Sequence, residues 1–184
     1  MISKYLPTFI LLSLFSSTVN ADFYIGAGLG RTEFEREGET ATQTFNYDDN
    51  KLSGSLFVGY HNKSYPEWMR FEGGLKYHGS WDVSKHDHNF NDELSSVTLT
   101  WVPTFISTSQ LNLVGKIGSF WWNSNHSGLT KFSDLQGGSG QKMYAGIALE
   151  VIVTKSLGFR IGAEEFDLDY VKMQSVELEV HYTF

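Results

Sequence analysis

The feature that most constrains the fold is a strict alternation of apolar and polar residues at the C-terminal end of the chain. Every second residue from 176 to 184 is apolar, and those between are polar: Val176, Leu178, Val180, Tyr182 and Phe184 against Glu177, Glu179, His181 and Thr183. Successive side chains of a β-strand point to opposite faces, whereas a helix would mix these two sets. The segment is therefore predicted to be a strand with one apolar face.

The same alternation recurs along the chain in segments of strand length. We predict eight strands, at 23–30, 52–60, 68–77, 94–102, 111–121, 143–153, 157–166 and 176–184. Their connections alternate between short links (61–67, 103–110 and 154–156) and longer polar loops (36–50, 78–93 and 123–141, with a shorter one at 167–172). An even strand number, with short turns at one end and longer loops at the other, is typical of outer-membrane barrels. The expected fold is all-β, an eight-stranded antiparallel up-and-down transmembrane β-barrel.

The N-terminal residues have a different character. Lys4 supplies a positive charge, residues 6–15 are apolar, and small residues lead up to Ala21. This order is typical of a secretory signal peptide, and the apolar run is shorter than the ~20 residues that a membrane helix needs. We expect a signal peptide at 1–21, cleaved after Ala21, and a barrel domain at 22–184.

Charge and composition narrow the partners. The chain has a formal net charge of −7, no cysteine and a mean hydropathy of −0.24. An acidic surface repels phosphate, so nucleic acid is not an expected partner. Without disulfides, stability has to come from packing or from lipid. The low hydropathy is compatible with a membrane barrel, because its strands alternate lipid-facing and interior residues.

Nine charged residues of the segments fall on the face opposite the apolar one. Because a charge facing lipid is costly, these side chains are expected to point into the barrel. They are Arg70, Lys76, Lys116 and Arg160, with Glu72, Glu150, Glu164, Glu177 and Glu179. In the first segment Tyr24, Gly26, Gly28 and Gly30 share this face, and the glycines indicate a crowded interior.

Aromatic residues lie near both ends of the segments, as expected for girdles at the two membrane interfaces. Those on the short-turn side are Phe23, Tyr24, Tyr60, Trp68, Trp101, Tyr182 and Phe184, and those on the long-loop side are Phe34, Tyr77, Trp81 and Trp121. The alternative is a soluble barrel with aromatic corners. We favour the membrane barrel, because the interior of eight strands is too narrow to bury both faces.

Four stretches of the chain resemble the OmpA-like outer-membrane barrel family: FYIGAGLG at 23–30, LFVGY at 56–60, FEGGLKY at 71–77 and VELEVHYTF at 176–184. The resemblance covers the whole mature chain and implies a place in the outer membrane of a Gram-negative bacterium. It also implies a C-terminal signal for the outer-membrane assembly machinery, made of Leu178, Val180, Tyr182 and Phe184.

The resemblance further implies a salt-bridge network that plugs the lumen. Its expected members are Arg70, Glu72, Lys76, Lys116, Glu150, Arg160 and Glu164. The fourth segment departs from the family pattern, with Thr98 and Thr100 where OmpA carries a lysine, which puts an exchange of ion pairs in doubt. Two interpretations stay open, a static plug of paired charges with trapped water and a narrow, regulated pore.

The expected function is a structural or surface-interaction role of the adhesion or colonisation type, without enzymatic activity, cofactor or metal. The expected partners are outer-membrane lipid, lipopolysaccharide and a host or surface ligand bound by acidic loops. Two alternatives are the narrow pore and a lipid A-modifying enzyme using His126, Ser127 and Asp134, although adjacent loop residues fix no catalytic geometry. His86 and His88 lie among carboxylates in the sequence, and such residue types can bind a metal ion. Their spacing, however, implies no complete ligand set.

Overall fold

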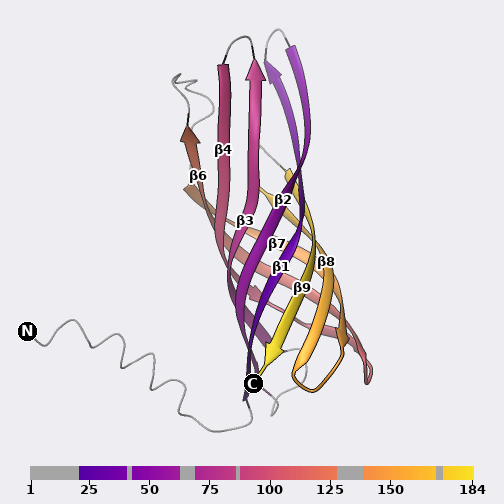
Figure 1. Cartoon of the computed structure of the whole chain (residues 1–184). Coiled ribbons are helices and arrows are strands. Elements are labelled where there is room, and N and C mark those ends of the chain that lie inside the picture. The colour runs from indigo at the N-terminus through magenta and orange to yellow at the C-terminus, as the bar shows by residue number, and fades with distance from the viewer. Residues whose placement is uncertain (1–20, 41–42, 63–68, 86–87, 128–138, 169–171) are drawn as a thin grey trace, which may run out of the picture.

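The computed structural model is a tall barrel built of strands (Figure 1). It describes residues 21–40, 43–62, 69–85, 88–127, 139–168 and 172–184, so the expected signal peptide lies outside the described residues apart from Ala21. The strands are β1 (Ala21–Thr40), β2 (Gln43–Asn62), β3 (Arg70–Lys85), β4 (His88–Trp101), β5 (Thr104–Ser107), β6 (Leu111–Ser127), β7 (Ser139–Ile152), β8 (Leu157–Asp167) and β9 (Lys172–Thr183).

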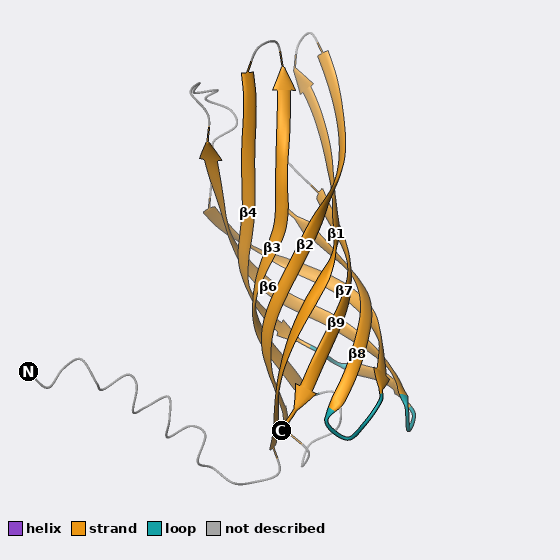
Figure 2. Cartoon of the chain, in the orientation of Figure 1, coloured by secondary structure: helices purple, strands orange, loops and turns teal. Residues whose placement is uncertain are grey.

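All neighbouring strands are antiparallel, and the sheet closes on itself. The order is β4-β3-β2-β1-β9-β8-β7-β6-β5, and a further pairing of β4 with β6 completes the ring. The short β5 continues the line of β4 after Val102 and Pro103, and both strands pair with β6. With β4 and β5 counted as one interrupted strand, the described part of the chain forms a closed eight-stranded barrel (Figure 2). This confirms the predicted fold.

The outer surface carries an apolar belt. Leu29, Leu56 and Leu75 expose 68%, 62% and 60% of their surface on neighbouring strands. Above the belt, the next outward positions are polar and exposed: Arg31, Asn123, Gln141, Glu165 and Gln174. Water would not favour so many exposed leucines, isoleucines and valines, so this belt is the surface that lipid covers. No helix in the described residues is long and apolar enough to cross a membrane.

Two connections that we predicted as long loops are mostly strand. β1 and β2 stay paired up to Thr40 opposite Gln43, and β3 and β4 up to Lys85 opposite His88. The expectation of loops at 36–50 and 78–93 is therefore wrong, and β6 and β7 likewise extend into 123–141. The alternation of apolar residues ends where the lipid ends, but a hairpin in water keeps its backbone hydrogen bonds without an apolar face.

The parts of the β1–β2 and β3–β4 hairpins that extend beyond the apolar belt are called the raised hairpins here. They separate from each other at Gly79. β2 pairs with β3 only between Gly54 opposite Tyr77 and His61 opposite Arg70. The register of β3 against β4 shifts between Tyr77 and Gly79, and Gly79 has a φ of 107°. Only glycine adopts this conformation at little cost. The bulge therefore directs the upper part of β3 away from β2, as the two separate pairs of arrows in Figure 1 show.

The short connections lie at the opposite end. Residues 154–156 form the predicted turn, in which the backbone N–H of Leu157 donates to Thr154 Oγ1 at 3.0 Å. The predicted link at 103–110 instead contains β5, because Pro103 interrupts the ladder and the chain then resumes pairing with β6. Most of the predicted link at 61–67 lies outside the described residues.

The interior is as crowded as the glycines of the first segment predict. A Cβ placed on Gly26 would collide with the ring of Phe57, and one placed on Gly59 would collide with the ring of Tyr24. In each pair the two residues face each other on β1 and β2. These glycines provide the space in which large interior side chains lie flat against the wall.

Candidate functional site

The centre of the lumen is a network of buried ion pairs. Arg70 on β3 donates to both carboxylate oxygens of Glu150 on β7, at 2.8 and 2.9 Å. Asn112 Nδ2 donates to the same carboxylate at 2.9 Å. A paired guanidinium and carboxylate with parallel hydrogen bonds is the strongest geometry available to these groups.

Arg160 on β8 lies at the middle of this network and is fully buried. Its Nη1 is 2.9 Å from Glu72 and 3.0 Å from Glu179, and its Nη2 is 3.3 Å from Glu150. Tyr24 donates its hydroxyl to Glu72 at 2.8 Å. One guanidinium thus joins carboxylates from three strands, since a planar fork of donors can reach several acceptors at once.

Two lysines complete the network on the side of the raised hairpins. Lys116 Nζ lies 2.7 Å from Glu164 and also bonds Glu179. Lys76 bonds Glu164 and lies 3.1 Å from Glu177. Each ammonium therefore has two carboxylate partners, as buried charges require.

The structure brings together all the residues that we expected in the lumen, from Arg70 to Glu164. The sequence analysis placed Glu177 and Glu179 on the inward face but left them out of the network. Their inward positions in the alternation of β9 could have identified them as members. It likewise left Tyr24 and His181 out of the network, although the alternation places both on the inward face; His181 Nε2 is 3.3 Å from Glu150. Nothing in the sequence distinguishes an inward tyrosine from a girdle tyrosine except its place in the alternation.

Thr100 occupies the place where the resemblance led us to look for a lysine. Its hydroxyl bonds the hydroxyl of Tyr144, which comes from β7. Beside it, a small cavity of about 20 Å³ is lined by Glu72, Lys116 and Glu164 among others. This volume fits about one water molecule in a polar setting.

Above the ion pairs, an apolar cluster fills the barrel on the side of the raised hairpins. Phe120, Phe166 and Met173 have no exposed surface. The rings of Tyr144 and Phe166 stack with centroids 4.7 Å apart, and Phe120 meets Phe166 edge-on at 5.1 Å. The full cluster is Phe34, Leu94, Phe120, Trp122, Tyr144, Phe166, Leu168 and Met173. We call it the apolar plug.

The plug corrects part of the predicted aromatic girdles. Phe34 and Tyr24 are 2% and 3% exposed and point inward, so neither belongs to a girdle. Both fall on the inward positions of β1, which nearness to a strand end does not reveal. The exposed aromatic residues that do lie near the ends of the belt are Phe23, Trp101, Tyr182, Phe184, Tyr77 and Trp121, with Tyr60 half-buried. Trp68 and the side chain of Trp81 lie outside the described residues.

The residues weighed for metal binding and catalysis give no assembled site in the described part of the chain. No group of three or more His, Cys, Asp or Glu there is placed to hold a metal ion. His86 and Asp134 lie outside the described residues, as do the side chains of His88, His126 and Ser127.

At the short-turn end the lumen opens into a polar cavity of about 270 Å³. Its lining includes Arg70, Asn112, Glu150, Lys155 and His181. Arg70 and Glu150 are already paired with each other at its inner end. The cavity therefore ends on the ion-pair network, with the apolar plug beyond it.

Comparison with known structures finds the same architecture. Ail, the attachment invasion locus protein of Yersinia pestis, superposes with a TM-score of 0.60 at 16% identity over 90% of this chain and 100% of that one. Neisserial surface protein A gives 0.56 at 12% identity over 88% and 97%, and OprG of Pseudomonas aeruginosa gives 0.55 at 13% over 89% and 96%. At these identities the likeness concerns the fold.

Sequence comparison identifies the family. No curated protein sequence matches the chain significantly. Residues 18–164, however, match the model of the OmpA-like transmembrane domain. The match spans most of the chain and agrees with the closed barrel and its apolar belt. The protein belongs to the family of OmpA-like transmembrane domains and is an outer-membrane β-barrel.

Proposed function

We propose that this barrel is a non-enzymatic surface protein of a Gram-negative outer membrane, and that its raised hairpins bind a ligand outside the cell. The observation that carries the proposal is the length of the β1–β2 hairpin beyond the apolar belt. The belt ends near Leu29 on β1, yet pairing with β2 continues to Thr40. At about 3.3 Å per residue, this hairpin extends roughly 35 Å past the edge of the belt.

The charge of this hairpin indicates the kind of ligand. Between residues 31 and 51 there are six carboxylates and three cationic side chains. An excess of negative charge on a raised surface attracts cationic partners and repels anionic ones. The Ail structure holds sucrose octasulfate, an analogue of heparin. The acidic hairpin favours a ligand of the opposite charge here, either a basic protein surface or divalent cations bridging to lipopolysaccharide.

The filled lumen supports a surface role over a pore. Ions crossing the barrel would meet the buried ion pairs of Arg70 and Arg160 and then the side chains of Phe120 and Phe166. Passing this stretch would require dehydrated ions to cross closely packed aromatic rings, which is costly. We therefore propose that the lumen is closed and serves to hold the wall rigid beneath the hairpins.

An adhesion assay tests the proposal. In one variant, residues 35–48 are replaced by an Asn-Gly turn, which joins Phe34 to its partner Asp49 in the existing register. In a second variant, Glu35, Glu37, Glu39, Asp48 and Asp49 become Gln or Asn. A non-adherent bacterial strain expressing each form is incubated with cultured epithelial cells. We expect adhesion with the wild type, loss with the shortened hairpin and a reduction with the neutral one.

The control is the folding of the barrel. A folded barrel migrates differently on SDS gels before and after boiling, and this heat-dependent shift should be the same in all three proteins. Adhesion that is equal for all three would contradict a role for this hairpin.

A further inference from the structure

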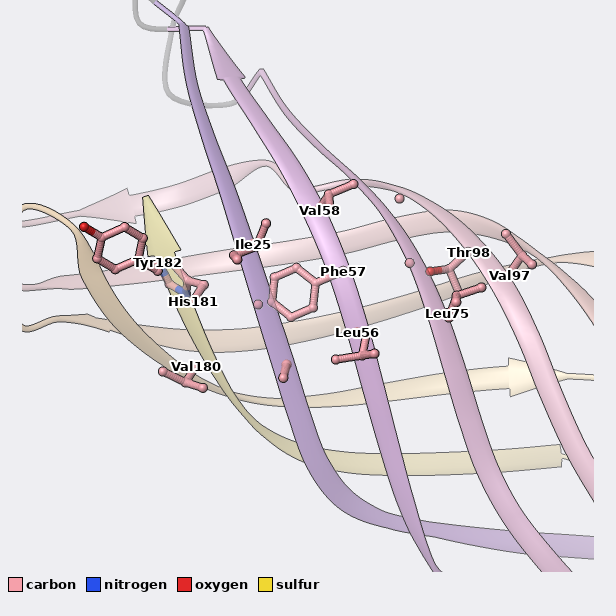
Figure 3. Close-up of a pocket in the computed structure, with 14 residues that line it drawn as sticks. Ile25, Leu56, Phe57, Val58, Leu75, Val97, Thr98, Val180, His181 and Tyr182 are labelled. Atoms are coloured by element: carbon pink, nitrogen blue, oxygen red, sulfur yellow. The ribbon is translucent and has the colours of Figure 1, made fainter. Parts of the chain in front are cut away.

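Two hollows in the outer wall lie over β1 to β4 and join into one groove. One hollow has a volume of about 750 Å³ and the other about 910 Å³, and Ala27, Leu56, Leu75 and Val97 line both. The first extends toward Tyr182 at the short-turn end. Figure 3 shows Ile25, Leu56, Val58, Leu75 and Val97 around it, on strands that run side by side.

Two glycines leave the floor of this groove open. Gly73 and Gly54 face outward, alternating with the inward Glu72 and Ser53. A Cβ placed on Gly73 would meet no atom within 4 Å, and one on Gly54 would make only ordinary contacts, at 3.5 Å to Gly28 and 3.6 Å to Leu29.

The inward glycines differ in this respect, because a Cβ on Gly59 or Gly26 would collide with an aromatic ring. Packing within the barrel therefore explains the inward glycines and gives no reason for Gly54 and Gly73. What the two outward glycines provide is space on the lipid side of the wall.

The groove lies inside the apolar belt and has a polar upper end. Leu56, Leu75 and Val97, which form its walls, are each at least half exposed on the outer surface. At the end nearer the raised hairpins it is lined by Tyr77, Ser95, Trp121 and Asn123, and Ser95 lies directly opposite Asn123 in the β4–β6 register. Apolar walls below hydroxyl, amide and indole groups match an acyl chain with a polar linkage at its top.

We propose that this groove is a lipid site that holds one acyl chain of a lipid A molecule of the outer leaflet, with the polar linkage of that chain near Ser95 and Asn123. The choice of leaflet rests on the proposed function, which places the raised hairpins outside the cell. The polar end of the groove then opens at the outer headgroup level, where lipid A is the resident lipid. The other end, near Val58 and Tyr182, receives the methyl end of the chain.

Native mass spectrometry of the detergent-solubilised barrel, titrated with purified lipid A, measures the site. The test variant is the double substitution Gly54→Leu/Gly73→Leu, which fills both hollows. The matched control is Ala163→Leu, an outward small residue on β8 between Ile147 and Val176 that lines neither hollow. Neither substitution introduces a charge, a Cβ at Gly54 or Gly73 meets no close atom, and Ala163 is exposed, so all three proteins should show the same heat-dependent gel shift.

We expect the wild type and Ala163→Leu to retain one lipid A molecule, and the double variant to bind it about tenfold more weakly, because side chains occupy the place of several methylene groups. Equal binding by all three proteins would overturn the proposal. So would equal competition by phosphatidylethanolamine, which would assign the groove to phospholipid.

The variant with the shortened β1–β2 hairpin separates this result from the proposed function. That variant keeps the groove, so it should bind lipid A normally even where adhesion is lost. Conversely, the Gly54→Leu/Gly73→Leu variant should lose lipid A binding and still adhere normally. This pair of results would show that the lipid site and the adhesive role of the hairpin are independent.

Discussion

Arg70 and Glu150 join two strands that are not neighbours in the barrel wall, through hydrogen bonds of 2.8 and 2.9 Å. Both side chains are buried, and Glu150 also accepts a hydrogen bond from Asn112 and lies 3.3 Å from Arg160. The pair fixes the distance between opposite walls. It also means that removing either partner leaves a buried charge without its main counterion.

Substituting Arg70→Met or Glu150→Gln should each lower the free energy of unfolding by about 3–5 kcal/mol, because each leaves a buried charge without its main counterion. The double variant Arg70→Met/Glu150→Gln should lose clearly less than the sum of the two single changes. Urea unfolding in lipid vesicles, followed by tryptophan fluorescence, measures all of these. Additive losses would show that the two residues do not act as a pair.

The two classes of glycine should respond oppositely to a larger side chain. Gly59→Leu drives a side chain into the ring of Tyr24 and should impair folding, whereas Gly73→Leu enters open space on the outer face and should be tolerated. The expected cost of the first change is about 1–3 kcal/mol or more. Refolding yield and the gel shift compare the two variants, and similar behaviour would argue against the crowded interior.

The apolar plug should be important for stability and for closure of the lumen. Phe166→Ala removes a ring with no exposed surface and should lower the free energy of unfolding by about 3–5 kcal/mol. The wild-type barrel in a planar bilayer should show no sustained single-channel current, because both the plug and the ion pairs fill its section. A stable open conductance of the wild type would restore the narrow pore as its function.

The C-terminal assembly signal remains a prediction of the sequence. Leu178, Val180 and Tyr182 all face outward on β9, and Phe184 is 73% exposed at the short-turn end. Phe184→Ala should therefore reduce the amount of barrel assembled in outer membranes of living cells while leaving folding into detergent micelles nearly unchanged. An equal loss in both settings would assign Phe184 a structural role instead.

Cleavage after Ala21 is also a prediction, since residues 1–20 lie outside the described residues. The mature protein should begin at Asp22. Mass spectrometry of protein extracted from outer membranes measures this directly. A mature form that still carries the apolar run at 6–15 would contradict the signal-peptide interpretation.

Alternation alone was sufficient to predict the eight strand positions around the barrel, the lipid-facing side of each and the inward set of charges. The reason is local: a strand turns each successive side chain to the opposite face, and lipid tolerates only one kind of residue. Residues such as Leu178 and Glu179 were assigned to the correct faces for that reason. The upper hairpins were not predicted, because above the membrane both faces are wet and the pattern that marks a strand disappears.

The sequence by itself therefore determined that this chain forms a closed barrel with charges inside and an apolar belt outside. Only the tertiary structure decided which charges meet, because Arg160 reaches Glu72 across 88 positions of the chain and no spacing rule encodes that register. It also decided that Phe34 belongs to a plug with Phe166 rather than to a girdle. Closure of the ring brings them together, and that is a property of the whole wall, whereas alternation is a property of each strand.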